Sequence, residues 1–132
     1  MFKNLMTATT ALCLFACQET KTNTINIEVQ QLEKEVLAIH DEVMPKMSEV
    51  ISLTHYLDSV VKYKPGQDSL VMVSSLLKKA DKDMMHWMRS YKSPEQPYDT
   101  ASIQYLQKEK LKVVQLKLDI NNALQLARPF KK

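Results

Sequence analysis

Glycine is nearly absent from this chain, which has a single glycine, Gly66, among its 132 residues. Phosphate-binding loops, nucleophile elbows and tight β-hairpins place glycine at fixed positions, because their backbones adopt conformations that other residues resist. The sequence also lacks the alternation of polar and apolar residues that is typical of half-buried strands. We therefore expect an all-α fold without a nucleotide-binding loop.

Arrangements of residues that support catalysis are missing as well. The sequence has no HExxH motif and no set of serine, histidine and aspartate at a known catalytic spacing. Asp41 and Glu42 are adjacent, but consecutive side chains on a helix point about 100° apart, so the pair is more typical of a solvated face. We expect this protein not to be an enzyme.

Charge of one sign is not concentrated anywhere except at the final Lys131 and Lys132. The chain has 18 basic and 15 acidic residues, and its formal net charge is +3. Nucleic-acid binding needs a basic patch that neutralises phosphates, and this mixed distribution does not supply one. Nucleic acid is therefore not an expected partner.

Cysteine occurs only twice, at Cys13 and Cys17. Lys3 precedes a short run of apolar and small residues, 5–16, which has the length of an export signal and is too short to span a bilayer as a helix. The run ends in Leu14-Phe15-Ala16-Cys17, which resembles the lipobox of bacterial lipoproteins, although Phe15 stands where a small residue is usual. The resemblance implies that residues 1–16 are a signal peptide and that Cys17 is lipidated.

This interpretation implies a protein anchored to the bacterial cell envelope through an N-terminal lipid. Gln18 follows the lipidated cysteine, in place of the aspartate that marks inner-membrane retention in some bacteria, so we expect the outer membrane. No thiol would then remain to form a disulfide. The alternative is that both cysteines are buried in an ordinary helix. It leaves the apolar start, followed by the polar residues 18–24, unexplained.

The rest of the sequence predicts a polar tether, residues 17–26, followed by a helical domain, residues 27–132. A first helix is expected over 27–63, since two apolar rows repeat there every seven residues. Pro45 and Lys46 interrupt this pattern, so we expect a kink at Pro45. The rows are Val29, Val36, Val43, Val50 and Leu57, and Leu32, Ile39, Lys46, Leu53 and Val60.

Two further helices are expected over 69–91 and 100–127, with turns at 64–69 and 93–99 that contain Pro65, Gly66, Pro94 and Pro97. Asp68, and either Asp99 or Thr100, stand where residues that cap helix N-termini are favoured. Short connections between long amphipathic helices predict antiparallel neighbours. The expected architecture is an up-down-up three-helix bundle whose long first helix is kinked by proline.

Methionine and histidine gather in two segments of these helices, 40–47 and 83–88. Antiparallel pairing about the turn predicts that Met47 faces Met84, Met44 faces Trp87 and Val43 faces Met88. One interpretation is that methionine fills the irregular space beside a proline kink. The other is a site for copper or haem, because thioethers and imidazoles bind soft metals. Its ligands would be His40, Met44, Met47, Met84 and Met88. His86 is expected to face solvent, and His55 is expected to be a surface residue.

The segments HDEVMPKM (40–47), ADKDMMHWMRSYK (80–92) and DTASIQYLQKEKLKV (99–113) resemble small helical lipoproteins of Bacteroidota, some of which are labelled viral A-type inclusion proteins. The resemblance covers most of the domain and implies no catalytic or binding residue. Two hypotheses are consistent with the sequence. The first is a lipid-anchored bundle that acts through contacts with a partner protein or with copies of itself. The second is metal or haem binding. For the first, exposed apolar residues are expected at Ile51, Met72, Met85 and Leu116.

Overall fold

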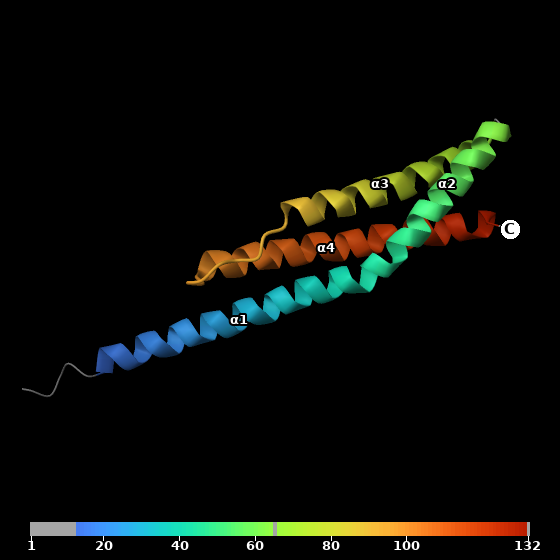
Figure 1. Cartoon of the computed structure of the whole chain (residues 1–132). Coiled ribbons are helices and arrows are strands. Elements are labelled where there is room, and N and C mark those ends of the chain that lie inside the picture. Colours follow the sequence, from blue (N-terminus) through green and yellow to red (C-terminus); the bar gives the residue numbers. More distant parts are fainter. Residues whose placement is uncertain (1–12, 65, 132) are drawn as a thin grey trace, which may run out of the picture.

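The computed structural model describes the backbone of residues 13–64 and 66–131, and the side chains of this part from residue 21 onward. The predicted signal peptide lies mostly outside these residues, as does the side chain of Cys17. The described part is all-helical and contains no strand (Figure 1). Its elements are α1 (Cys13–Val43), η1 (Met44–Lys46), α2 (Met47–Tyr63), α3 (Asp68–Ser90), α4 (Thr100–Ala127) and η2 (Arg128–Phe130).

Helix α4 is the element against which most of the others pack. Its contacts with α1 and with α3 are extensive, and α2 packs mainly on α3. Figure 1 shows α1 running beside α4, and α2 beside α3. Helices α1 and α3 make few direct contacts with each other. Helix α1 is therefore held in place chiefly through α4, whereas α3 packs on both α2 and α4.

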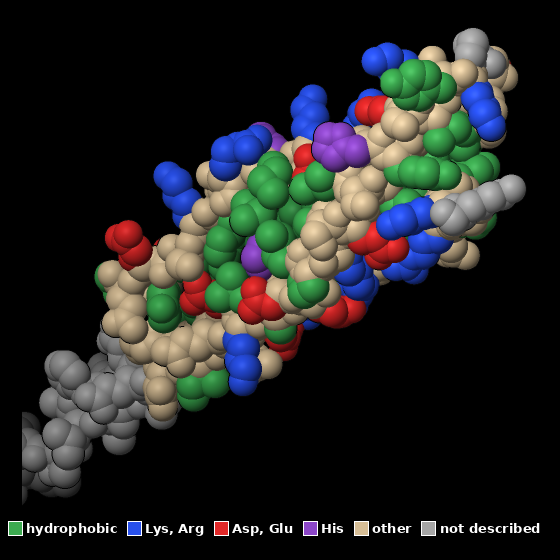
Figure 2. All heavy atoms as spheres, turned by 45° about the vertical axis from the view of Figure 1, so that its right-hand side comes forward, with side chains coloured by type: hydrophobic (Ala, Val, Ile, Leu, Met, Phe, Trp, Pro, Cys, Tyr) green, Lys and Arg blue, Asp and Glu red, His purple; other side chains and the backbone are tan. Residues whose placement is uncertain are grey.

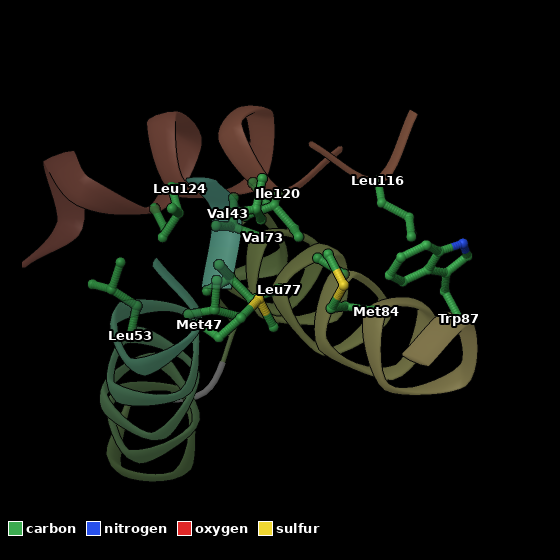
Figure 3. Close-up of a cluster of buried hydrophobic side chains, with 14 of the residues drawn as sticks. Val43, Met47, Leu53, Val73, Leu77, Met84, Trp87, Leu116, Ile120 and Leu124 are labelled. Carbon is green, nitrogen blue, oxygen red and sulfur yellow. The ribbon is translucent and has the colours of Figure 1, made fainter. Parts of the chain in front are cut away.

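The hydrophobic core is built from rows of residues spaced by seven. The first of the two rows predicted in the first helix, which begins at Val29, is buried in full. Helix α4 supplies another buried row with the same spacing. Residues seven apart lie almost on one line along a helix, so two such rows pack along their whole length. Figure 3 shows how α2, α3 and α4 converge on this core. The two rows are Val29, Val36, Val43, Val50 and Leu57, and Leu106, Val113, Ile120 and Ala127.

Polar bonds between α1 and α4 show that these helices run in the same direction. Lys110 Nζ bonds Glu35 at 2.7 Å, and Lys117 Nζ bonds Glu42 at 2.7 Å, each across 75 residues of sequence. Lys46 Nζ, just beyond α1, bonds Asn121 at 2.9 Å across the same interval. A constant interval between partners requires parallel helices in fixed register.

The register changes after the short 3-10 helix η1. Arg128 makes a two-pronged bond to Glu49, with Nε and Nη2 each 2.9 Å from a carboxylate oxygen, and here the interval is 79 residues. Pro45 lies in the first turn of η1, where its missing N–H costs no helical hydrogen bond. Arg128 lies in η2, directly after α4, so this bond ties the start of α2 to the end of the α4 segment, and the buried row continues from Val43 to Val50.

The predicted polar tether is helical in the structure. Helix α1 begins at Cys13 and includes residues 17–26, so the backbone of this segment continues the first helix toward its N-terminus. No proline or glycine interrupts the stretch from Cys13 to Val43. Ile25 is half-buried ahead of the buried Val29, so the apolar face starts earlier than predicted. The threonines of this segment lower helix propensity but do not stop a helix.

The remaining boundaries agree closely with the prediction, apart from one cap. Helix α4 spans the predicted residues, and Asp99 Oδ1 accepts a hydrogen bond of 2.8 Å from Ser102 N in a capping box. Asp68, by contrast, is the first residue of α3. The preceding Gln67 occupies the cap position without a side-chain bond. No helix in the described residues has the length and apolar character needed to cross a bilayer.

The bonds between α1 or α2 and α4 predict a loss of stability in acid. The hydrogen bond from Lys110 is the main cause that lowers the pKa of Glu35 below the ordinary 4.5, and Lys117 does the same for Glu42. Arg128 lowers the pKa of Glu49 in the same way. A carboxylate whose pKa is lowered by folding stabilises the folded state above its unfolded pKa, and this contribution disappears as pH falls through the folded pKa.

We expect the midpoint of thermal unfolding, followed by circular dichroism, to fall as the pH is lowered from about 5 to about 3. The triple variant Glu35→Gln, Glu42→Gln, Glu49→Gln should be less stable at pH 7 and should lose less stability over this range. An equal acid response in the variant and in the unaltered protein would show that these three pairs do not cause it.

Candidate functional site

The structure divides the five predicted metal ligands between the core and the surface. Met47 and Met84 are buried in the apolar cluster, where Figure 3 shows them among Leu77, Val73 and Trp87. Met44 is half-buried against the same cluster. Met88 is exposed. The two buried thioethers are therefore surrounded by aliphatic and aromatic side chains.

His40, the fifth predicted ligand, contacts an aromatic ring and a carboxylate. Its ring centroid lies 5.5 Å from that of Trp87, and its Nδ1 lies 3.0 Å from Asp41 Oδ1. The sequence placed Met44 opposite Trp87, and Met44 packs against the core cluster to which Trp87 belongs; the contact of Trp87 with the tilted ring of His40 was not predicted. His40 is therefore one of the few links between α1 and α3. His55 and His86 are exposed or half-buried at the surface.

Aromatic rings continue from His40 along α3 toward α4. The Trp87 centroid lies 5.0 Å from that of Tyr91, and Tyr91 lies 6.3 Å from Tyr105. Burial, and secondarily the nearby Glu33 carboxylate, raise the pKa of Tyr91 to about 12. Such a phenol stays protonated at neutral pH. The row His40, Trp87, Tyr91, Tyr105 crosses the molecule at the end of α3.

Glu109 is a buried carboxylate that the sequence interpretation missed. Only 4% of the residue is exposed, and its Oε2 accepts a 2.9 Å hydrogen bond from Trp87 Nε1. Lys112 Nζ, itself exposed, bonds Oε1 at 2.6 Å. The signal was present in the sequence. Glu109 stands seven residues before the buried Leu116, in the row that continues to Ala123. A charged residue in such a row indicates a specific buried partner.

The outer face between α3 and α4 carries a shallow groove of about 430 Å³ beside Trp87. Charges of both signs line it, which suits a solvated surface better than an apolar ligand. Leu116 lies at its base and is 9% exposed, so its predicted exposure is wrong. The row of α4 to which it belongs faces the core. The lining residues are Lys79, Asp83, His86, Trp87, Ser90, Lys112, Gln115, Leu116 and Asp119.

On the side of α3 that lies away from this groove, a line of residues faces α2 in the first part of α3 and α1 in the last part. Ser74 Oγ lies 2.5 Å and Lys78 Nζ 2.8 Å from Asp58 of α2, which fixes the direction of this line. Spacing of three and four residues continues it through Asp81 to Met85 and Met88. Met88 is exposed and Met85 half-buried. These two methionines therefore extend toward α1 where the helices no longer touch closely.

A matching line on the first helix contains Leu37, His40 and Met44, again spaced by three and four. Contact of His40 with Trp87 fixes its direction toward α3. We call the surface formed by Leu37, His40, Met44, Met85 and Met88 the α1–α3 wedge. Figure 2 shows apolar side chains gathered along the middle of one face of the molecule, with a histidine among them.

Comparison of the chain with protein-family models, with curated proteins and with solved structures finds no match in any of the three. Within the described residues, no three side chains of histidine, cysteine, aspartate or glutamate form a cluster able to hold a metal ion. The function of the chain is therefore inferred from its own residues.

Removing the acceptor from the buried Trp87–Glu109 pair should destabilise the fold. We expect Glu109→Leu to cost about 1–3 kcal/mol in the free energy of unfolding, because the indole N–H remains buried without a partner. Glu109→Gln keeps an acceptor oxygen of the same reach and should cost less. Urea unfolding followed by Trp87 fluorescence measures both. Equal costs for the two variants would show that the hydrogen bond to the indole is not what stabilises the pair.

Proposed function

We propose that this chain is a lipid-anchored helical bundle of the bacterial cell envelope that acts by binding another protein and not by catalysis. In this proposal residues 1–16 are a signal peptide, Cys17 carries the lipid, and the protein resides at the outer membrane. Helix one, kinked at Pro45, is followed by two shorter helices in an up-down-up three-helix bundle. The interruption at η1 and the parallel course of α1 and α4 support this topology.

The observation that carries the proposal is the α1–α3 wedge. It presents Leu37 and Met88 to solvent, with Met44 and Met85 half-buried beside them. Exposed apolar residues that are contiguous along two neighbouring helices are typical of a contact surface. Methionine is flexible and polarisable, so it adapts to an apolar partner whose shape is not fixed in advance. The partner we propose is an amphipathic helix of another envelope protein, which would bury its apolar face there.

A photo-reactive residue at position 88 tests this in living cells that produce the full chain. We expect a cross-linked adduct of one defined mass, because Met88 borders the proposed site. The same probe at Leu126, an exposed leucine of α4 away from the wedge, is the matched control.

Adding Met85→Glu to the position-88 probe should abolish the adduct, since a carboxylate in the wedge would disfavour an apolar helix. Unchanged thermal unfolding of this variant would confirm that the bundle is intact. An adduct of equal yield from position 126, or one that persists with Met85→Glu, would count against the wedge as the binding surface. The membrane fraction and the mass of the chain with and without Cys17→Ser report separately on lipidation.

Soft-metal or haem binding is the second candidate function. It is favoured by one arrangement, in which His40 and Met44 lie one turn apart on the wedge and Met88 lies on the facing line. Met47 and Met84 would have to leave the core cluster to join them. Titration with Cu(I) and with haem, followed by absorbance, should show a site that His40→Ala abolishes and His86→Ala does not. Equal binding by both variants would remove His40 as a ligand.

A further inference from the structure

The face of α4 that points away from the core carries a line of residues without any charge. At spacings of three and four it contains Gln104, Gln107, Leu111, Val114, Leu118, Asn121 and Gln125. Six of these residues are exposed, whereas Asn121, at the edge of the line, is half-buried and accepts the hydrogen bond from Lys46. Such spacing places them on one side of the helix, opposite the buried row of Leu106, Val113 and Ile120. One-quarter of the residues of this chain are charged, and charges are usual on the solvent side of a helix. We call this line the α4 outer seam.

The middle of the α4 outer seam is apolar and open. Leu111 is 72% exposed and Leu118 is 50% exposed, and Val114 lies between them. Leu111 and Leu118 stand at one position of a seven-residue repeat, and Val114 stands at the other. Amides occupy the outer positions at both ends. This is the pattern of a short two-helix contact with polar ends.

We propose that the α4 outer seam pairs with the same seam of a second copy of this chain, in a parallel dimer with two-fold symmetry along the helices. The seam suits a copy of itself, because each leucine meets its equivalent and each glutamine meets an amide. A partner helix with charged side chains would meet no side chain of opposite charge on the seam. That this dimer forms on a membrane rests on the proposed function, in which a lipid anchors the chain.

The flanking charges favour the parallel orientation. In a parallel pair, Lys110 and Lys117 would lie beside Gln115 and Asn122 of the second copy, which are uncharged. In an antiparallel pair, Lys110 of one copy would lie beside Lys117 of the other. Like charges in such positions are destabilising, and the bonds of these two lysines to Glu35 and Glu42 of the same chain reduce the repulsion without removing it. Because α1 and α4 run in the same direction, the parallel arrangement also places both lipid anchors at one end, where a single membrane can hold them.

The size of the seam predicts a weak dimer in dilute solution. From Gln104 to Gln125 it is about 32 Å long, at 1.5 Å per residue. One helix-to-helix contact of this length is near the lower limit of about 1,000 Å² for a specific interface. Two chains held in one membrane meet at a far higher effective concentration, as linked modules do. The dimer is therefore expected on membranes and not in dilute solution.

Disulfide trapping tests the orientation and the surface together. Leu111→Cys and Leu118→Cys are made singly in the full acylated chain, in which Cys13 has been removed and the sulfur of Cys17 is blocked by lipid. The protein is placed in vesicles of phosphatidylethanolamine and phosphatidylglycerol and oxidised. A disulfide needs Cα atoms within about 7 Å, which a parallel seam provides at each leucine and an antiparallel seam does not.

We expect both variants to form covalent dimers at least about tenfold faster than Leu126→Cys, a comparably accessible position of α4 off the seam. Adding Leu118→Glu to Leu111→Cys should abolish the difference without changing helicity. Rates equal to that of Leu126→Cys, or disulfides formed only when Leu111→Cys and Leu118→Cys chains are mixed, would overturn the parallel dimer.

The mass and membrane partition of the same samples separate this result from the proposed function. A chain that is acylated and membrane-bound but does not form the disulfides refutes the dimer alone. A chain that is never acylated, yet forms the disulfides at high concentration, refutes the lipid anchor and leaves the seam intact.

Discussion

The packing of the valine row of the first helix on α4 is the contact on which the rest of the structure depends. Val29, Val36 and Val43 are fully buried, and Leu106, Val113 and Ile120 provide the matching row of α4. Helices α1 and α3 touch little directly, so α1 is positioned through α4, while α3 is positioned through α2 and α4 together. The long first half of the first helix therefore depends on its contact with α4. The same arrangement leaves apolar side chains of α1 and α3 available along the wedge, where a direct contact would have covered them.

Two charged residues interrupt the apolar rows, and they play different parts. Lys46 stands in the second apolar row of the first helix, and its ammonium group lies outside the core, where it donates a hydrogen bond to Asn121. The carboxylate of Glu109 is buried, and each of its oxygens accepts a hydrogen bond, one from Trp87 and one from Lys112. Burying a carboxylate is expensive unless its oxygens are bonded, so the indole and the ammonium group are needed together. Trp87 is thereby held in one orientation, with His40 against its ring.

The sequence was sufficient to predict helices, their order and most of the core, because periodicity depends on local geometry. The buried valine row and the span of α4 follow directly from spacing. The helical backbone of the predicted tether was not anticipated, because threonine and asparagine lower helix propensity only slightly, while the half-buried Ile25 and the buried Val29 favour continuing the helix. The contact of His40 with Trp87 was not predicted, for another reason. A pairing rule based on the turn assumes two straight helices, and η1 interrupts the first of them. Whether Met88 is covered depends on how far α1 diverges from α3, and the spacing of residues along a helix does not contain that distance.

The parallel register of α1 and α4 has a consequence for how this chain can change its length. Glu35 and Glu42 meet Lys110 and Lys117 at one constant interval, and the buried rows share the same repeat. Inserting or deleting one residue in either helix would rotate every later side chain by about 100° and bring charged groups into the core. Insertions of seven residues, made in both helices at once, would lengthen the pair and keep the register of the contacts between α1 and α4. Relatives of different length should therefore differ by matched heptads in these two helices, and by arbitrary numbers only in the loops.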